Sequence, residues 1–528
     1  MPVSSILSKY LAIILLSVLV ACGGGSSDIT PADTDNDGVA DAIDNCIDEP
    51  NADQVDTDVN DQGDACDAMP TVYNFKNSYY TANADSVSYT GQVARQLLIS
   101  GMVDYMETMT ESSEAKETFK DGLDFYMNGD GADEVATGFI LKNGNADGSD
   151  IANAATYGAV SSGKNLDGKI AGGNGEGGGE TSKLIGDEFF GWSEELNADD
   201  TPIVLVDKWI EELAQQASNG TSVLVDTVNG KVTLDSVHYD EQGRNQRQLL
   251  QKFLMGAVSF SQGTNDYFQA DWAVQVGARE GAKNYTEAEH NFDEAFGYYG
   301  AARDNNDYED EEARAKNGRD DWKNGYHDTD GNGLIDPRSE FNFGHSQNCA
   351  KRDFGTADNA NPTDLSTEVM NAFLAGRQII SNASNAGFIT DAELTALTGN
   401  IKTAAVTWEK CIAATTIHYI NDVTEDMGNF VGNQFANVDN FTDLGKHWSE
   451  MKGFALSLQF SPFSPFRDAE VTAVDLNDLK GLLAGMGDAP VLATDTQEVI
   501  DAYRVFLASA RDLLQAAYNF DADNVANW

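Results

Sequence analysis

Apolar residues recur at helical spacing over most of the chain beyond residue 70, and this pattern constrains the fold more than any other feature. In segment 496–519, Val499, Tyr503, Phe506 and Leu514 follow the spacing of one buried helix face. Similar periods cover 91–110, 206–218, 245–263, 286–303, 365–386, 391–427, 444–460 and 496–519. Only 222–225 and 231–237, separated by Asn229-Gly230, have the pattern of strands in one hairpin. We therefore expect a mainly α fold, with a large helical-bundle domain over 70–528.

The charge of the chain narrows the choice of ligands. It has 33 Lys and Arg residues against 86 Asp and Glu residues, a formal net charge of −53. A surface this negative repels phosphate backbones, so we expect no nucleic-acid partner. Carboxylate oxygens are the ligands that hard cations such as Ca²⁺ prefer, so calcium is an expected cofactor.

The first 22 residues predict the compartment. Lys9 precedes an apolar run over 11–20 that is too short to span a membrane. The following Leu19-Val20-Ala21-Cys22 resembles a bacterial lipobox. The resemblance implies a signal peptide over 1–21, lipidation of Cys22 and a flexible tether over 22–32. It also implies an outer-membrane location on either face, because Gly23 and not Asp follows the cysteine. An ordinary secretory signal is the alternative.

Four further cysteines predict two disulfides, since the envelope is oxidising. They are Cys46, Cys66, Cys349 and Cys411, which allow three pairings. We favour Cys46 with Cys66 and Cys349 with Cys411. The first two lie in one short acidic stretch, and the other two lie in the large domain.

Segment 33–67 contains thirteen acidic residues and no Lys or Arg. Its alternating Asp residues, its Asp44-Asn45-Cys46 and its terminal Gly63-x-x-Cys66-Asp67 resemble the thrombospondin type 3 repeat. The resemblance implies a small, irregular, disulfide-stapled module over 33–69 that holds calcium. The implied ligands are Asp33, Asp35, Asp37, Asp41, Asp56 and Asp58. A solvated acidic linker is the alternative.

A second acidic loop lies at 328–340. Asp328, Asp330, Asn332 and Asp336 occupy positions 1, 3, 5 and 9 of an EF-hand-like calcium loop. At position 12 the loop has Ser339, and Glu340 follows one residue late. We expect a calcium site here, with an Asp/Gly-rich turn as the alternative. The glycine-rich stretch 161–183 lacks the residue order of a phosphate-binding loop and predicts a flexible surface loop.

His447 and Glu450 stand three residues apart on a predicted helix, so both side chains can reach one ion. Gly445-x-His447-x-x-Glu450 resembles the signature of the imelysin-like family. These are helical bacterial envelope proteins tied to iron handling, some of them described as metallopeptidases.

A second histidine, His290, has acidic neighbours at helical spacing. Together with Asp293, Glu294, His447 and Glu450 it predicts one mixed site for Fe, Zn or Mn. The alternative is that both groups only cap or bridge helices. The other histidines are expected at the surface (His238, His327, His345) or in the core (His418).

Segments 289–300 and 447–460 resemble the bacterial lipoproteins that contain domain of unknown function 4856, over most of 72–528. The resemblance implies an all-α, imelysin-like domain. We expect a non-enzymatic outer-membrane lipoprotein that binds calcium and a transition metal in envelope iron acquisition. One alternative is a metallopeptidase-like hydrolase in which His447 and Glu450 hold the ion and Glu294 activates water. Another is an interaction module that docks to an envelope partner such as an outer-membrane receptor.

Overall fold

The computed structural model describes residues 32–77, 84–112, 114–144, 150–172, 184–193, 201–219 and 223–528. The predicted signal peptide, Cys22 and residues 173–183 of the glycine-rich stretch lie outside these ranges. The described chain forms two compact units. One contains 32–55 and Gln62–Asp67, and the other contains Asp56–Asp61 and Ala68–Trp528.

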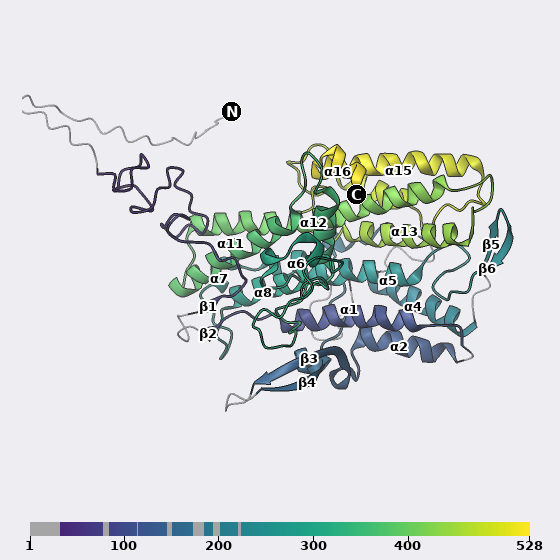
Figure 1. Cartoon of the computed structure of the whole chain (residues 1–528), viewed down its shortest axis with the longest axis horizontal. Helices are drawn as coiled ribbons and strands as arrows, with labels where there is room; N and C mark the ends of the chain where they lie inside the picture. Colours follow the sequence, from purple (N-terminus) through teal and green to yellow (C-terminus); the bar gives the residue numbers. More distant parts are fainter. Residues whose placement is uncertain are drawn as a thin grey trace, which may run out of the picture. The chain divides into compact units, whose positions relative to one another are not determined.

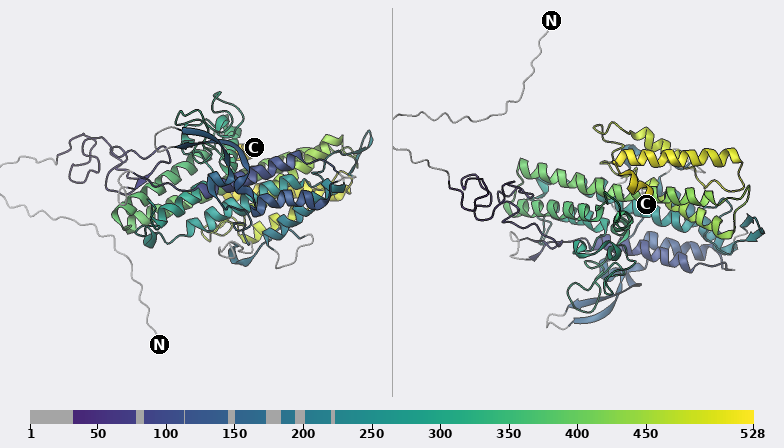
Figure 2. Two further views of the ribbon diagram at one scale, coloured as in Figure 1. Left: turned by 90° about the horizontal axis from the view of Figure 1, so that it is seen from below. Right: turned by 45° about the horizontal axis from the view of Figure 1, so that its top comes forward.

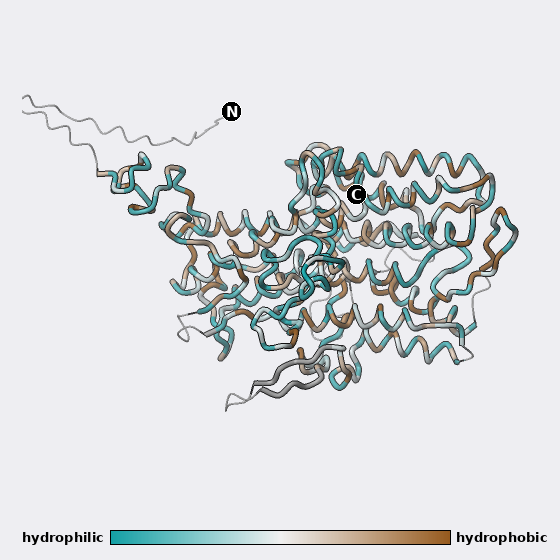
Figure 3. Tube along the Cα trace, in the orientation of Figure 1, coloured by the Kyte–Doolittle hydropathy of each residue, from teal (hydrophilic) through white to brown (hydrophobic). Residues whose placement is uncertain are grey.

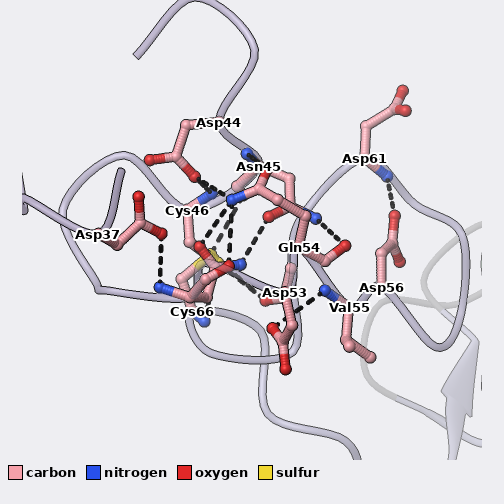
Figure 4. Close-up of a disulfide and its surroundings, with 12 residues drawn as sticks. Asp37, Asp44, Asn45, Cys46, Asp53, Gln54, Val55, Asp56, Asp61 and Cys66 are labelled. Atoms are coloured by element: carbon pink, nitrogen blue, oxygen red, sulfur yellow. Dashed lines mark hydrogen bonds between the residues drawn. A yellow bond between two sulfur atoms is a disulfide. The ribbon is translucent and has the colours of Figure 1, made fainter. Parts of the chain in front are cut away.

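The small unit has no helix or strand in its described residues and is held by one disulfide, Cys46–Cys66 (Figure 4). Hydrogen bonds replace a hydrophobic core. The Gly63 N–H donates to the Asn45 carbonyl at 3.1 Å, and the Asn45 side chain donates to the Gln54 carbonyl at 3.1 Å. The predicted irregular, disulfide-stapled form is confirmed.

The large unit is mainly helical, as predicted (Figure 1). Its α-helices are α1 (Thr90–Thr108), α2 (Lys116–Asn128), α3 (Tyr157–Ser161), α4 (Pro202–Asn219), α5 (Gln246–Leu254), α6 (Ser261–Asn265), α7 (Trp272–Gln275), α8 (Glu287–Tyr299), α9 (Asp310–Ala313), α10 (Gly344–Thr356), α11 (Leu365–Ala386), α12 (Asp391–Gly428), α13 (Val438–Ser457), α14 (Leu476–Gly485), α15 (Gln497–Tyr518) and α16 (Ala522–Asn527). Short 3₁₀ turns are η1 (Ala132–Glu134), η2 (Ile185–Asp187), η4 (Tyr267–Gln269) and η5 (Asn305–Asp307).

The strands form two-stranded antiparallel sheets. They are β1 (Lys76–Asn77) with β2 (Ala84–Asp85), β3 (Ala136–Gly144) with β4 (Asp150–Thr156), and β5 (Leu224–Thr227) with β6 (Gly230–Thr233). The last pair is the predicted hairpin, whereas the other two pairs show that the expectation of strands only at 222–225 and 231–237 was wrong. The observed hairpin strands differ from the predicted bounds by two residues or fewer at three of their four ends. Thr227 pairs with Gly230, so the turn consists of Val228 and Asn229.

The predicted helices agree with the observed ones where the apolar period is long. Helix α11 matches 365–386, and α12 extends 391–427 by one residue. Segment 245–263 is interrupted by a π-helical turn, η3 (Met255–Phe260), which separates α5 from α6. Segment 286–303 ends early, because Gly300 adopts a left-handed conformation with φ of 82° that closes α8.

Helix α12 is the centre of the packing in this unit. It contacts α11 and α13 along its length and also α10 and α15. Its Trp408 is fully buried, and its Cys411 forms the second predicted disulfide with Cys349 of α10. The long helices run roughly alongside one another (Figure 2), and hydrophobic residues alternate with hydrophilic ones along them (Figure 3). The apolar stripes therefore meet inside the bundle.

Candidate metal centre between helices α12 and α13

One face of α12 carries His418, Asp422 and Asp426 at four-residue intervals. Residues four apart lie above one another on a helix, so the three side chains form a stripe. Helix α13 faces this stripe with His447. On its other side α13 packs against the loop before α5, because a Cβ on Gly445 would lie 2.3 Å from the carbonyl oxygen of Gly243. The glycine of the Gly-x-His-x-x-Glu pattern is therefore a site of close backbone contact with this loop.

The four side chains meet through Asp422 and Asp426. His447 Nδ1 lies 2.8 Å from Asp426 Oδ2, which leaves its Nε2 directed toward Asp422 at 3.8 Å. His418 Nε2 lies 3.4 Å from the same Asp422 oxygen. Ligand atoms around a tetrahedral ion at about 2.0–2.1 Å are about 3.4 Å apart, so each imidazole lies at a distance at which it could share an ion with Asp422. The ligand atoms of His418, Asp422 and His447 do not all lie within 4.8 Å of one another, so the side chains would have to move closer to bind one ion. A carboxylate that holds one ring nitrogen of a histidine is a common partner of metal-binding imidazoles.

The electrostatics of the two histidines differ. Burial lowers the pKa of His418 to about 3, together with the positive charges of Arg352 and His447. Burial also acts to lower the pKa of His447, but the hydrogen bond and charge of Asp426 outweigh it and hold the pKa above its usual value. His418 is therefore a neutral imidazole near pH 7, which is the form that binds a metal, whereas the raised pKa of His447 favours its protonated form, which must lose a proton before it can bind one.

Glu450 faces a different neighbour from His447. Its Oε1 lies 3.3 Å from Lys252 Nζ of α5, and its Oε2 is buried with no hydrogen-bond partner among the described residues. Tyr419 lies between the two motif residues. Its ring stacks on His447 at 6.1 Å, and its pKa is raised first by burial and then by Glu450, to which it hydrogen bonds. Of the two motif residues, His447 thus contacts the carboxylates of α12, and Glu450 pairs with Lys252 of α5.

The structure places Asp293 in a buried ion network, with Arg377 of α11. Arg377 Nε donates to Asp293 at 2.8 Å, and its Nη1 donates to Glu289 at 3.1 Å, with all three side chains fully buried. The Tyr73 hydroxyl also donates to Asp293 at 2.9 Å. The oxygens of Asp293 are therefore occupied by protein donors.

His290 and Glu294 line a separate pocket at the start of α1. His290 Nδ1 lies 2.5 Å from Glu280, and its Nε2 lies 3.6 Å from Glu294. Helix α8 packs on α1, α6 and α11, whereas α13 packs on α5 and α12 (Figure 1). The structure does not bring His290, Asp293 and Glu294 to the partners of His447.

The acidic module brings three of its predicted calcium ligands together. Carboxylate oxygens of Asp33, Asp35 and Asp37 lie within 4.8 Å of one another. One oxygen of Asp35 is buried without a hydrogen-bond partner in the described chain, as a cation ligand would be. Asp41 is occupied by Thr34, whose backbone N–H and hydroxyl donate to it at 2.7 and 2.8 Å.

The other two predicted ligands of this module, Asp56 and Asp58, belong to the loop that groups with the large unit. Asp56 accepts the backbone N–H groups of Asn60 and Asp61 at 3.2 and 3.0 Å. Asp58 is 3% exposed and accepts from the Asn382 side chain of α11 at 2.7 Å. Each has an ordinary hydrogen-bonding role in that unit.

The loop 328–340 brings Asp328 and Asp330 together with Glu340, with ligand oxygens within 4.8 Å of one another. Glu340, one residue late for the EF-hand pattern, is 4% exposed and accepts the backbone N–H groups of Thr329 and Asp336. Asp336 pairs with Arg338 at 2.6 Å, and Asn332 accepts the Leu334 N–H at 2.8 Å.

Buried Asp304 adjoins this loop, beside a cavity of about 230 Å³ that Asp330, Asp336 and Glu340 also line. Thr329 donates to one of its oxygens at 2.7 Å, and the other oxygen has no partner among the described residues. Burial raises the pKa of Asp304. An oxygen-rich hollow of this kind suits a hard cation.

The remaining histidines have structural partners. His238 Nε2 lies 2.7 Å from the Met106 carbonyl, His345 Nε2 lies 3.0 Å from the Met255 carbonyl, and His327 stacks on Trp322. The expected surface position of His345 is wrong, because its side chain is buried. His418, expected in the core, is half-buried beside Asp422, and the sequence interpretation did not connect it with His447. Its four-residue spacing from Asp422 and Asp426 was the available signal.

A comparison with known protein families shows to which family the chain belongs. The profile of the family described as domain of unknown function, DUF4856, matches residues 199–485, more than half of the sequence. The chain belongs to the DUF4856 family. The DUF4856 match begins just before α4 and ends with α14, so it includes His418, His447 and the loop 328–340. Searches of curated proteins and of solved structures found no match. No helix in the described ranges is both long and apolar enough to cross a bilayer.

Proposed function

We propose that this protein is an outer-membrane-anchored lipoprotein that binds a transition metal between α12 and α13 and calcium at its two acidic loops. Its proposed role is the binding or acquisition of a metal in the envelope, and the Gly-x-His-x-x-Glu resemblance favours iron. The observation that carries the proposal is the shared position of His418 and His447 around Asp422.

The donor set supports a metal such as Fe, Zn or Mn. Two imidazoles and a carboxylate are ligands of intermediate softness, and Asp426 fixes the orientation of His447. His418, Asp422 and His447 would hold the ion. A bound ion of this class supplies Lewis acidity, or redox chemistry in the case of iron.

Calcium binding is proposed at Asp33, Asp35 and Asp37, and at Asp328, Asp330 and Glu340. Both groups consist of carboxylates from one short loop, and both adjoin a buried carboxylate oxygen without a protein partner. Glu340 takes the role that the sequence pattern gave to position 12. In this proposal calcium stiffens the acidic module, which has almost no hydrophobic core of its own.

The hydrolase alternative receives less support from the geometry. Glu294, the proposed base, donates no oxygen to the α12–α13 cluster, since it accepts from Gln92 at 2.8 Å and lies beside His290. The interaction-module alternative predicts binding of an envelope partner that does not depend on the metal.

Metal analysis and calorimetric titration test the transition-metal site. The purified protein, saturated with calcium, is titrated with Zn²⁺, Mn²⁺ and Fe²⁺, and we expect about one ion per chain. The double variant His418→Ala/His447→Ala should lose this ion. His290→Ala is the matched control, because His290 is also half-buried between two carboxylates. Equal binding by the double variant and the wild type would overturn the site.

Lipid attachment is tested in cells by incorporation of labelled palmitate. The wild-type chain should carry the label and fractionate with the outer membrane, and Cys22→Ala should lose both properties. Labelling that persists in Cys22→Ala would refute the lipoprotein assignment.

A further inference from the structure

A pocket of about 370 Å³ lies at the N-terminal end of α1, away from the α12–α13 cluster. Its walls come from the start of α1, from the segment 161–169, from Tyr267, from the loop 280–285 and from α8. Segments distant in sequence thus build one small concave site. Its lining is unusually basic for this chain.

Four cations line the pocket, namely Arg95, Lys164, Lys169 and Lys283. The carboxylates that line it are Glu280 and Glu294. The chain as a whole has 86 acidic residues and only 33 basic ones, so the local charge is opposite to the overall charge. A pocket of reversed sign concentrates anions and repels free metal cations.

The cations are held at the pocket by neighbouring groups. Arg95 Nε donates to the Asn165 carbonyl at 2.8 Å, and Lys169 Nζ donates to the Tyr267 hydroxyl at 3.2 Å. The pocket also borders the first turn of α1, where Tyr89 provides no side-chain cap. The N–H groups of Gln92 and Val93 already donate to the Tyr89 carbonyl, so an anion at this end of the helix would use those of Thr90 and Gly91.

Gln92 provides a further polar group at this site. It is 1% exposed, its amide nitrogen donates to Glu294 at 2.8 Å, and its Oε1 is buried with no partner among the described residues. A carbonyl oxygen in this state requires a donor such as a hydroxyl group. Glu280 and His290, 2.5 Å apart, offer additional acceptor atoms, and the Tyr285 ring packs on His290.

We propose that this pocket binds a small hydroxylated anion, an acidic sugar or a sugar phosphate. The cations and the first turn of α1 hold the carboxylate or phosphate, and the oxygens of Gln92 and Glu280 accept from its hydroxyl groups. The tyrosine rings provide flat faces for a sugar ring. The two halves of the predicted His–carboxylate site thus have different ligands, an anion at His290 and a metal at His447.

Calorimetric titration in EDTA tests this proposal separately from metal binding. The probes are galacturonate and glucose 6-phosphate, with glucose as the neutral control. At least one anion should bind about tenfold more tightly than glucose, and the stronger of the two identifies the anionic group. Affinity should fall as salt is raised, because the attraction is electrostatic.

The variant Lys164→Gln/Lys283→Gln should weaken binding about tenfold, since it removes two of the four cations. The matched control Lys231→Gln/Lys323→Gln makes the same change of charge outside the pocket. Absence of anion binding by the wild type at about 10 mM probe, salt-independent binding, or equal affinities of the two double variants would each overturn the proposal.

Discussion

Glu409 of α12 is a buried acid whose ionisation should destabilise the protein. It is fully buried, and one oxygen accepts from the hydroxyls of Ser464 at 2.5 Å and Tyr518 at 2.7 Å. The other oxygen has no partner in the described ranges. Burial raises the pKa of Glu409 from 4.5 to about 7, although these hydrogen bonds oppose the rise.

The magnitude follows from this shift. Each pKa unit corresponds to about 1.4 kcal/mol, so a rise from 4.5 to about 7 corresponds to about 3 kcal/mol. The folded state binds the proton more tightly than the unfolded state. The stabilising contribution of protonated Glu409 is therefore complete below about pH 4.5 and is lost as the pH rises through about 7.

The perturbation is Glu409→Gln, which keeps the shape and the two accepted hydrogen bonds but cannot ionise. Urea unfolding at pH 5 and pH 8 should show the variant more stable than the wild type at pH 8 by about 2.5 kcal/mol relative to their difference at pH 5, where the contribution is not yet complete. The matched control is Glu498→Gln, on the exposed start of α15. A wild-type-to-variant difference that does not change with pH would refute the reasoning.

Three further perturbations follow from the structure. Arg377→Met should lower the free energy of unfolding by about 3–5 kcal/mol, because it leaves Glu289 and Asp293 as unpaired buried charges. Urea unfolding measures the loss. Adding Glu289→Gln/Asp293→Asn to the same chain should restore stability if the unpaired charges are the cause. Cys349→Ser/Cys411→Ser should lower the free energy of unfolding by about 4 kcal/mol at most, because the disulfide closes a loop of 62 residues and so restricts the unfolded chain. An unchanged melting temperature would contradict this. Glu340→Gln should weaken calcium binding at the loop 328–340 about tenfold in calorimetry, whereas Asp320→Asn, 96% exposed, should not.

The spacing of apolar residues along the sequence predicted the long helices well, because an apolar residue at every third or fourth position over many residues indicates one buried helix face. It missed α10 (Gly344–Thr356), whose buried side chains include His345, Asn348 and Arg352. A helix that buries polar groups has no apolar period. Such burial is stable only when partners from distant segments satisfy those groups, for example the Met255 carbonyl that bonds His345.

The candidate site shows the same division. The spacing along one helix predicted that His447 and Glu450 could reach the same ion. Two residues three apart differ by about 60° around a helix, which is enough to face different neighbours at a crowded interface. Tertiary packing therefore directed His447 to Asp422 and Glu450 to Lys252.

The sequence by itself determined the mainly α class, the acidic composition of segments 33–67 and 328–340 and the family, and it favoured the two disulfide pairs that the structure contains. These properties depend on composition and local spacing. The tertiary structure alone decided that His290 and His447 have separate surroundings and that His418 joins the second. Side-chain partners of this kind depend on which helices pack together, and no local pattern contains that information.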